Sequence, residues 1–300
     1  MTQLQKYTWL IETIRRAGKI SHKDLSDRWE RAKDLSDSHP LPRATFNRWR
    51  DAIFSQFGIN IECQKTGGYL YYIENPDDIE DDKLKKWMLD SFAVGNLIGE
   101  NLSLKDRILV SKIPSGSHHL TTIIQAMKDY NMVEITYRPF KHTHGYTFSI
   151  EPYCVKLHEN RWYALGKNNR GEMRLYGLDR IESTNILNSK FLLPKNFNAS
   201  EFFSPFYGVA IGYENQPQRI VVRANENHKY YLNTLPLHES QILIEDCGEY
   251  ADFELYLVPS FDFVMKLLQF GSMIEVIYPD SLRKTMKGWI SDMMELYKND

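Results

Sequence analysis

The sequence has few cysteines, no long hydrophobic run and no excess of charge of either sign. Its three cysteines, Cys63, Cys154 and Cys247, stand roughly ninety residues apart. This spacing argues against a disulfide framework or a thiolate metal cluster and fits a reducing compartment. No apolar run approaches the about 18 residues that a membrane-spanning helix needs. The N-terminus lacks the apolar core of a signal peptide, so we expect a cytoplasmic protein with no membrane partner.

Signatures of catalysis are also missing from the sequence. It has no G-x-S-x-G nucleophile motif, no phosphate-binding G-x-x-x-x-G-K-[ST] and no G-x-G-x-x-G after a strand. Two His-Glu pairs begin like a zinc-protease motif, but neither is followed by the second histidine. His142 and His144 have no further metal ligands at a recognisable spacing. We therefore predict a protein that is not an enzyme and that holds no cofactor or metal.

The composition that remains is that of a folded chain with more than one domain. The 300 residues are 42% hydrophobic and 25% charged, which excludes a disordered or fibrous protein. At about 100–200 residues per domain, this length predicts two or three domains. The 37 basic and 39 acidic residues give a net charge of −2, so the whole chain carries no positive field. A nucleic-acid partner has to be sought in local charge.

The first 75 residues have such a local difference, with 12 lysines and arginines against 9 aspartates and glutamates. Apolar residues at helical spacing predict a first helix that ends at Gly18, and Ser21 caps a second. Pro42 then precedes a third helix over 43–54. Two strand-like runs, 59–63 and 69–73, follow and are joined by a glycine turn. This order predicts a winged helix-turn-helix domain over 1–75. The alternative is a small helical domain with a solvated arginine face.

The third helix of such a domain reads bases in the major groove of duplex DNA. At 100° per residue, Arg43, Asn47 and Arg50 lie on one strip beside the apolar face of this helix. These three residues are the predicted base-reading set, and a different rotation of the helix gives that role to Thr45 and Arg48. Lys65, in the turn between the two strands, is predicted to contact phosphates.

The rest of the chain divides into three further predicted parts. An acidic stretch opens a linker and helical connector over 76–117, with helices from Lys83 and from Leu104 and a break at Pro114-Ser115. Strand-like runs rich in aromatic and β-branched residues predict a second domain over 118–190. Residues 200–300 show the order βαββαβ, with a last helix from Ser281, which predicts a ferredoxin-like domain.

Three motifs in the middle of the chain follow one another at short spacing. Glu151-Pro152-Tyr153 is followed by Arg161-Trp162-Tyr163-Ala164-Leu165 and then by Leu178-Asp179-Arg180-Ile181. This region resembles the WYL domain, the ligand-sensing module of bacterial transcription regulators. The triplet that names the family reads Trp162-Tyr163-Ala164 here, with leucine one place later.

The resemblance extends to the parts before and after these motifs. The N-terminal part resembles the DNA-binding domain of such regulators, and the last part resembles the family's C-terminal WCX-like extension. The resemblance implies a small, strongly bent sheet like an Sm β-barrel for the WYL domain. The predicted fold class is therefore multidomain α+β.

The residues of the middle domain also suit the binding of an anion. Basic groups on adjacent strands can converge on one pocket, and the planar arginine side chain binds two phosphate oxygens at once. An aromatic neighbour can stack on a base. Alternatively, Arg180 forms an ion pair with Asp179, and Tyr163 belongs to the core together with Trp162. The candidate ligand residues are Tyr137, Ser149, Arg161, Tyr163, Arg174 and Arg180, with His142 and His144 nearby.

Together these observations predict a ligand-responsive transcription regulator that binds duplex DNA as a homodimer. For some relatives the resemblance implies a nucleotide or single-stranded nucleic acid as the signal. The alternative function is a nucleic-acid sensor that serves a defence system and has no promoter target.

Overall fold

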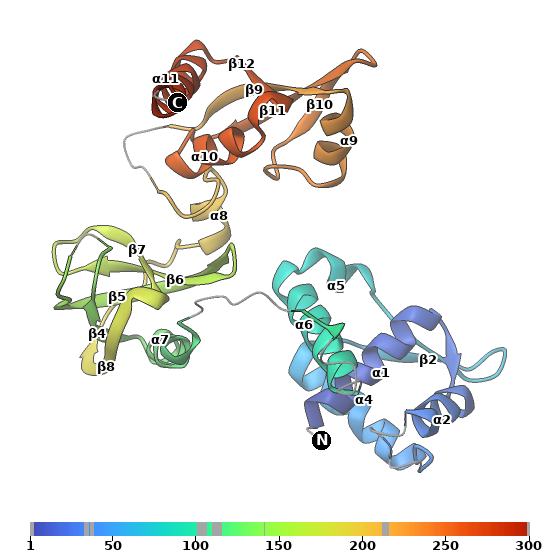
Figure 1. The fold of residues 1–300 in the computed structure, drawn as a ribbon. Coiled ribbons are helices and arrows are strands. Elements are labelled where there is room, and N and C mark those ends of the chain that lie inside the picture. Colours follow the sequence, from blue (N-terminus) through green and yellow to red (C-terminus); the bar gives the residue numbers. More distant parts are fainter. Residues whose placement is uncertain are drawn as a thin grey trace. The chain divides into compact units, whose positions relative to one another are not determined.

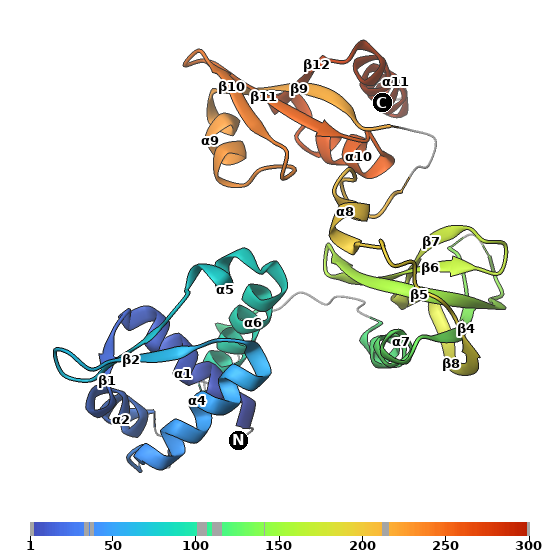
Figure 2. The same ribbon diagram turned by 180° about the vertical axis from the view of Figure 1, so that it is seen from behind.

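The computed structural model describes residues 3–32, 36, 39–100, 107–109, 116–140, 142–211 and 216–298. The chain forms two compact units, residues 1–111 and 112–300. Figures 1 and 2 show the elements of each unit from opposite sides. The connector helix expected from Leu104 and the break at Pro114-Ser115 lie outside the described residues. The bounds of the four predicted parts of the chain stay a prediction.

The first unit combines helices with a small antiparallel sheet. The helices are α1 (Gln3–Ala17), α2 (His22–Arg31), α4 (Arg43–Phe57), α5 (Asp77–Asp81) and α6 (Lys83–Glu100). The strands β1 (Ile20–Ser21), β2 (Ile61–Gln64) and β3 (Leu70–Ile73) form a sheet in the order β1-β3-β2. The predicted third helix and the two strands after it are thus observed, and the short strand β1 is an element that the sequence patterns did not predict.

Capping and apolar spacing explain these helices. The Ser21 hydroxyl accepts a hydrogen bond from the Asp24 amide and begins α2, while Gly58 ends α4 in the left-handed conformation. Leu10, Ile14 and Leu25 of α1 and α2 are fully buried against Phe46 of α4. One hydrophobic core thus fixes the exposed side of α4.

The second unit begins with helix α7 (Ser117–Asp129) and a five-stranded antiparallel sheet. Its strands are β4 (Asn131–Tyr137), β5 (Tyr146–His158), β6 (Arg161–Asn168), β7 (Met173–Gly177) and β8 (Ile181–Lys190), in the order β7-β6-β5-β4-β8. Ile123 and Ala126 of α7 pack on Val133, Ile135 and Ile150 of the sheet. Trp162 is a partly buried member of the same core, while Tyr163, its neighbour, lies on the other face of β6.

The expectation of a closed Sm-like barrel is wrong for this sheet. Among the described residues β7 pairs only with β6, and β8 pairs only with β4. A 3-10 turn, η2 (Leu178–Arg180), carries the chain from one edge strand to the other. A barrel closes only when strand tilt and register stagger bring its first and last strands together. Sequence motifs report the strands but neither of these two quantities.

A second antiparallel sheet follows in the same unit. Its strands β9 (Gln218–Asn225), β10 (Ile242–Asp246), β11 (Tyr250–Leu257) and β12 (Ile274–Tyr278) have the order β10-β11-β9-β12. Helices α9 (Glu226–Thr234) and α10 (Phe261–Gln269) lie on one face of this sheet (Figure 2). Helix α11 (Asp280–Leu296) packs on the same core through Leu282 and Met286. The chain thus has the βαββαβ order predicted from its sequence.

A strap of residues 203–211, which begins at the end of helix α8 (Ala199–Phe203), links the two sheets of this unit. Lys156 of β5 donates a hydrogen bond from Nζ to the Gly208 carbonyl over 2.7 Å. The Asp262 carboxylate at the start of α10 accepts from the amides of Val209 and Ala210, both at 2.7 Å. Gly208 has φ +78°, and an added Cβ would overlap Asp262. The strap therefore requires glycine at this position.

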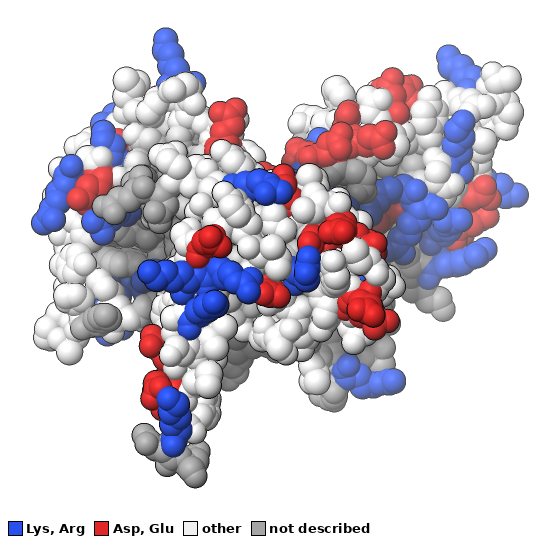
Figure 3. Space-filling view, turned by 90° about the horizontal axis from the view of Figure 1, so that it is seen from above, with Lys and Arg blue, Asp and Glu red and all other residues white. Residues whose placement is uncertain are grey.

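Charged side chains of both signs are interspersed over the face of the molecule that Figure 3 draws. This matches the small net charge of the sequence. Among the helices of the described residues, none is long and apolar enough to cross a membrane.

Candidate functional site

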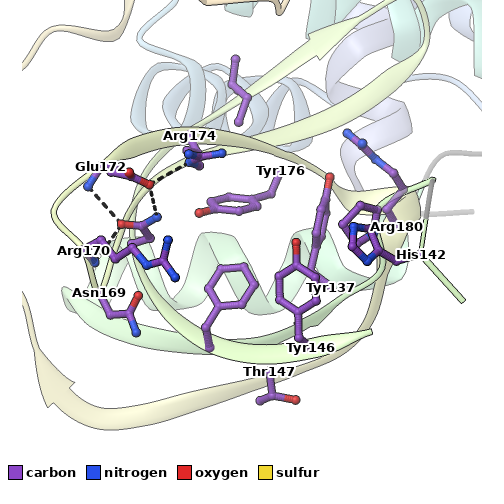
Figure 4. Close-up of a pocket in the computed structure, with 14 residues that line it drawn as sticks. Tyr137, His142, Tyr146, Thr147, Asn169, Arg170, Glu172, Arg174, Tyr176 and Arg180 are labelled. Carbon is purple, nitrogen blue, oxygen red and sulfur yellow. Dashed lines mark hydrogen bonds and ion pairs between the residues drawn. The ribbon is translucent and has the colours of Figure 1, made fainter. Parts of the chain in front are cut away.

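A pocket of about 610 Å³ opens on the five-stranded sheet (Figure 4). Strands β4 to β7 and the turns between them supply its walls. Its lining residues are Tyr137, Pro139, His142, Tyr146, Thr147, Phe148, Asn168, Asn169, Arg170, Glu172, Arg174, Leu175, Tyr176 and Arg180. The pocket is large enough for a ligand of nucleotide size.

Aromatic rings form the floor of the pocket. The Tyr176 ring lies 5.4 Å from the Tyr137 ring, edge to face, and 5.5 Å from the Phe148 ring. Tyr146 extends this row, 5.8 Å from Phe148. Since Tyr137 and Tyr176 belong to the buried core of the sheet, the floor is held in place by the fold itself. Such a surface can accept a flat ring by stacking.

Arginines stand at both ends of this floor (Figure 4). Arg170 and Arg174 lie at one end, where Arg174 Nε is 3.0 Å from the Glu172 carboxylate. Arg180 lies at the other end with its guanidinium 5.2 Å from the Tyr137 ring centre. Among the described residues no carboxylate forms an ion pair with Arg180. Three guanidinium groups against one carboxylate leave the pocket positive.

The Tyr176 hydroxyl is a polar group without a partner inside this pocket. Tyr176 is 4% exposed, and its oxygen has no hydrogen-bond partner. Burial raises the pKa of this phenol to about 12, although Arg174 acts in the opposite direction. The Asn168 amide also opposes the shift, without the geometry of a hydrogen bond. The hydroxyl therefore stays protonated at neutral pH and can donate to an acceptor on a ligand.

The pocket contains three of the six predicted ligand residues, namely Tyr137, Arg174 and Arg180. Arg161 and Tyr163 alternate with core residues on β6 and point to the other face of the sheet, where Arg161 pairs with Asp179 at 3.1 Å. Ser149 likewise alternates with Phe148 and lies away from the pocket. The alternative for Arg180, an ion pair with Asp179, is not observed among the described residues, and Asp179 pairs with Arg161 instead.

The sequence reasoning missed several lining residues. His142 was placed near the first hairpin, and it does line the pocket, whereas His144 does not. Tyr176 of the floor could have been predicted from the sequence, because it lies two residues after Arg174 and therefore shares its face of the strand. Phe148 is the other floor residue that the sequence reasoning missed. Arg170 lies in the turn between β6 and β7, where Asn168 Oδ1 accepts from the Arg170 amide at 2.9 Å. Turn chemistry of this kind is visible in the sequence, but the direction of the side chain is not.

The first unit exposes a second candidate surface on α4. Arg43, Asn47 and Arg48 are exposed, Thr45 is half-buried, and Lys65 is exposed in the turn between β2 and β3. Arg43 also approaches the fold, with Nη2 3.4 Å from the Tyr71 hydroxyl. These side chains form a polar, basic helix surface with a basic turn beside it.

Arg50 is held differently from the other predicted base-reading residues. Its Nε and Nη2 both donate to the Ile61 carbonyl, at 2.9 and 2.5 Å, and its guanidinium lies 5.4 Å from the Tyr71 ring centre. This arginine ties α4 to β2. The structure therefore favours Arg48 over Arg50 as the second exposed arginine of the helix.

In the described part of the chain, no group of three or more His, Cys, Asp or Glu side chains is arranged to hold a metal ion.

Residues 118–186 match the family model of the WYL domain. The match covers α7 and most of the five-stranded sheet, including every residue that lines the pocket. Residues 118–186 therefore form a WYL domain, as the sequence motifs indicated.

Two solved structures are similar to this chain at low identity. Proteasome accessory factor B/C (PafBC) of Arthrobacter aurescens is 16% identical, with a TM-score of 0.32 over 85% of this chain and 42% of that protein. A CRISPR Cas-related protein is 10% identical, with a TM-score of 0.38 over 100% of this chain and 87% of that one. The chain thus spans less than half the length of the first protein. No curated protein matches the sequence.

Proposed function

We propose that this protein is a ligand-responsive transcription regulator. Its first unit binds duplex DNA as a winged helix-turn-helix, and its WYL pocket binds a nucleotide-like ligand or single-stranded nucleic acid. The observation that carries this proposal is the pocket itself, in which arginines flank an aromatic floor and the Tyr176 hydroxyl has no partner.

Each feature of the pocket corresponds to one part of such a ligand. An aromatic floor accepts a base by stacking, which is worth about 1–3 kcal/mol per base. Arginines bind phosphate oxygens in pairs. The neutral phenol donates to a phosphate or base oxygen without adding charge. A nucleotide is the class of ligand that uses all three features together.

The order of elements in the first unit supports the DNA-binding part. The order α1-β1-α2-α4-β2-β3, with a sheet of order β1-β3-β2, supports a winged helix, in which α4 would be the recognition helix. Arg43, Asn47 and Arg48 then face bases, and Lys65 approaches the phosphates. One such helix reads only a few base pairs, so we expect a homodimer on two half-sites one or two turns of DNA apart, at about 34 Å per turn.

The ligand-binding part is tested by replacing one arginine of the pocket. Arg174→Ala should weaken binding of a fluorescent single-stranded oligonucleotide or of a nucleoside monophosphate roughly ten- to a hundredfold, because it removes a contact worth about 1.5–3 kcal/mol. The matched control is Arg161→Ala, which also loses an ion pair of about 3 Å but lies outside the pocket. Equal affinities of Arg174→Ala and the unchanged protein for both probes would reject the site.

The DNA-binding part is tested on the region upstream of the protein's own gene. Footprinting there should show a protected site, and competition with scrambled duplex should show sequence preference. Arg43→Ala, Asn47→Ala and Arg48→Ala should reduce that preference, at about 1–3 kcal/mol per lost base contact. Lys65→Ala should weaken binding to all sequences alike. A protein that binds the oligonucleotide but no duplex would instead be a sensor without a promoter target.

A further inference from the structure

The sheet of β9 to β12 ends in an edge strand, β10, that is unusual in composition. Ile242, Leu243 and Ile244 are consecutive, and each is about half exposed. Among the described residues β10 pairs only with β11, so its outer backbone amides and carbonyls face solvent. Proteins commonly protect such edges with lysine or proline, which are absent from 242–246. A register shift between Leu243 and Glu245 and the carboxylates of Glu245 and Asp246 protect only the second half of this strand.

Side chains of neighbouring elements extend this apolar edge. Tyr256 of β11 projects on the same face as Ile242, one diagonal position away. Tyr230 of α9 lies near the other end, because the Lys229 ammonium that bonds to Asp246 is 5.1 Å from the Tyr230 ring. The five residues of this β10 edge patch, each between 45% and 63% exposed, are Tyr230, Ile242, Leu243, Ile244 and Tyr256.

The chemistry of the patch determines what can cover it. Another strand can form hydrogen bonds with the unpaired backbone groups along an edge strand. Three adjacent apolar side chains are stabilised when they pack against apolar side chains of a partner. A second copy of β10 supplies both. In an antiparallel pair centred on Leu243, which lies before the register shift, the two Leu243 residues are opposite each other. Ile242 then lies beside Ile244 of the second copy, and Glu245 lies beside Gln241. No carboxylate then faces another, whereas a pair centred on Glu245 would place two carboxylates together.

We propose that β10 pairs with β10 of a second copy of this chain, antiparallel and centred on Leu243. The two sheets then become one continuous sheet of eight strands across a two-fold axis. Tyr230 and Tyr256 of both copies cover the two faces of the junction. The contact lies in the second unit, so it requires no DNA and no occupied WYL pocket.

A second apolar surface competes with this assignment and provides the control for it. A groove of about 950 Å³ lies between β12 and α11 and is lined by Ile290, Met293 and Met294, among others. β12 is the other edge strand of this sheet, but Arg283 of α11 donates a hydrogen bond to the Val276 carbonyl over 2.6 Å, so the chain itself already covers part of this edge. The β10 edge patch is distinguished by its backbone as well as its side chains.

Sedimentation equilibrium of the full chain without DNA tests the interface. The unchanged protein should be a dimer at micromolar concentration. Leu243→Lys should raise the dimer dissociation constant at least ~10-fold, because it sets two lysines directly opposite each other. Met294→Lys, which places the same charge in the groove of α11, should leave that constant unchanged. A monomeric unchanged protein, or dissociation by Met294→Lys and not by Leu243→Lys, overturns the proposal.

A cross-link tests the register and avoids a charged substitution. Directly opposite residues of antiparallel strands have Cα atoms about 4.5–5.5 Å apart, which suits a disulfide. Leu243→Cys, made with Cys247→Ser to remove the exposed cysteine, should form a disulfide dimer under mild oxidation. Ile242→Cys in the same background should cross-link poorly, because each copy faces Ile244. Efficient cross-linking of Ile242→Cys alone, or none from Leu243→Cys, rejects this pairing.

Neither experiment depends on the proposed regulator function. A protein that fails to bind duplex or oligonucleotide can still dimerise through β10, and a monomer can still bind both. The failure of one proposal is therefore distinguishable from the failure of the other.

Discussion

The buried Tyr176 hydroxyl has no hydrogen-bond partner, and under the proposed function it gains one only when a ligand is bound. A buried hydroxyl without a partner costs about 1–3 kcal/mol. Tyr176→Phe should therefore leave the free energy of unfolding of the second unit unchanged or raise it by about 1 kcal/mol, as measured with urea. The same change should weaken binding of a nucleoside monophosphate. A large loss of stability would show that the hydroxyl has a partner in the native state. Tyr256→Phe, at an exposed phenol outside the pocket, should change neither quantity.

Two glycines allow backbone strain to be separated from crowding. Gly208 and Gly171 have φ of +78° and +80°, but a Cβ at Gly208 would lie 2.9 Å from the Cβ of Asp262, whereas at Gly171 its nearest neighbour is 4.0 Å away. Gly171→Ala should cost about 1 kcal/mol from the left-handed backbone alone. Gly208→Ala should cost a further ~1–3 kcal/mol from overpacking. Thermal unfolding of both variants measures the difference, and equal losses would show that Asp262 moves aside freely.

The residues of the pocket differ in how well the sequence predicts their positions. Arg174 and Tyr137 lie in the pocket as expected, because residues two apart on a strand share a face, but alternation does not say which face carries the pocket. The expectation for Arg161 and Ser149 is wrong, because a motif gives the type of each residue but not the face of the sheet on which its side chain lies. Arg170 was missed because its direction depends on turn geometry, which the sequence determines only together with the surrounding strands.

At the scale of elements, Arg50 joins a helix to a strand. Its two hydrogen bonds to the Ile61 carbonyl are charge-assisted and half-buried. Arg50→Ala should therefore lower the free energy of unfolding of the first unit by about 1.5–3 kcal/mol. Arg48→Ala, at an exposed position of the same helix, should leave that free energy unchanged. Urea unfolding followed by tryptophan fluorescence measures both, and equal stabilities would show that the Arg50 contact contributes little.

Elements were more predictable than their assembly. Helices 226–234 and 261–269 and the strands around them follow from apolar period and capping residues, because Asn225 and Ser260 each accept from an amide of the first turn. The two-residue strand β1 was missed, since so short a run has no period. The open edge between β7 and β8 depends on the register of the three strands between them, and no single segment encodes it.

Across the whole molecule, partly or fully buried histidines make the free energy of unfolding of both units depend on pH. Burial lowers the pKa of His22 in the first unit and of His119 and His158 in the second. A lowered folded pKa means that the unfolded chain binds a proton first. Stability should therefore be complete above about pH 6.5 and fall as the pH drops from there toward the lowered values.

His119 is a suitable position for testing this pH dependence. Its Nε2 lies 2.9 Å from the Ile181 carbonyl in the buried interior. His119→Gln keeps an amide donor and removes the titration, so unfolding of the second unit should depend less steeply on pH between about 6.5 and 5. Denaturant unfolding at several pH values gives the slope. An unchanged slope would mean that the folded state accepts the proton at His119 without cost.

The ion pair of Glu172 with Arg174 has to be broken before a ligand anion can bind Arg174. Hydrogen bonds from Asn168 and then from Arg174 lower the pKa of Glu172, so this carboxylate is charged at neutral pH. Because Glu172 is on the same hairpin as Arg174, its carboxylate competes with any ligand anion for the Arg174 guanidinium. Its effective concentration is on the order of millimolar. A simple carboxylic acid offers Arg174 nothing that Glu172 does not already give. A phosphate carries more charge and can engage Arg170 as well, so it can displace the Glu172 carboxylate. We therefore expect simple carboxylic acids to bind this pocket weakly and phosphoryl groups to bind it more tightly.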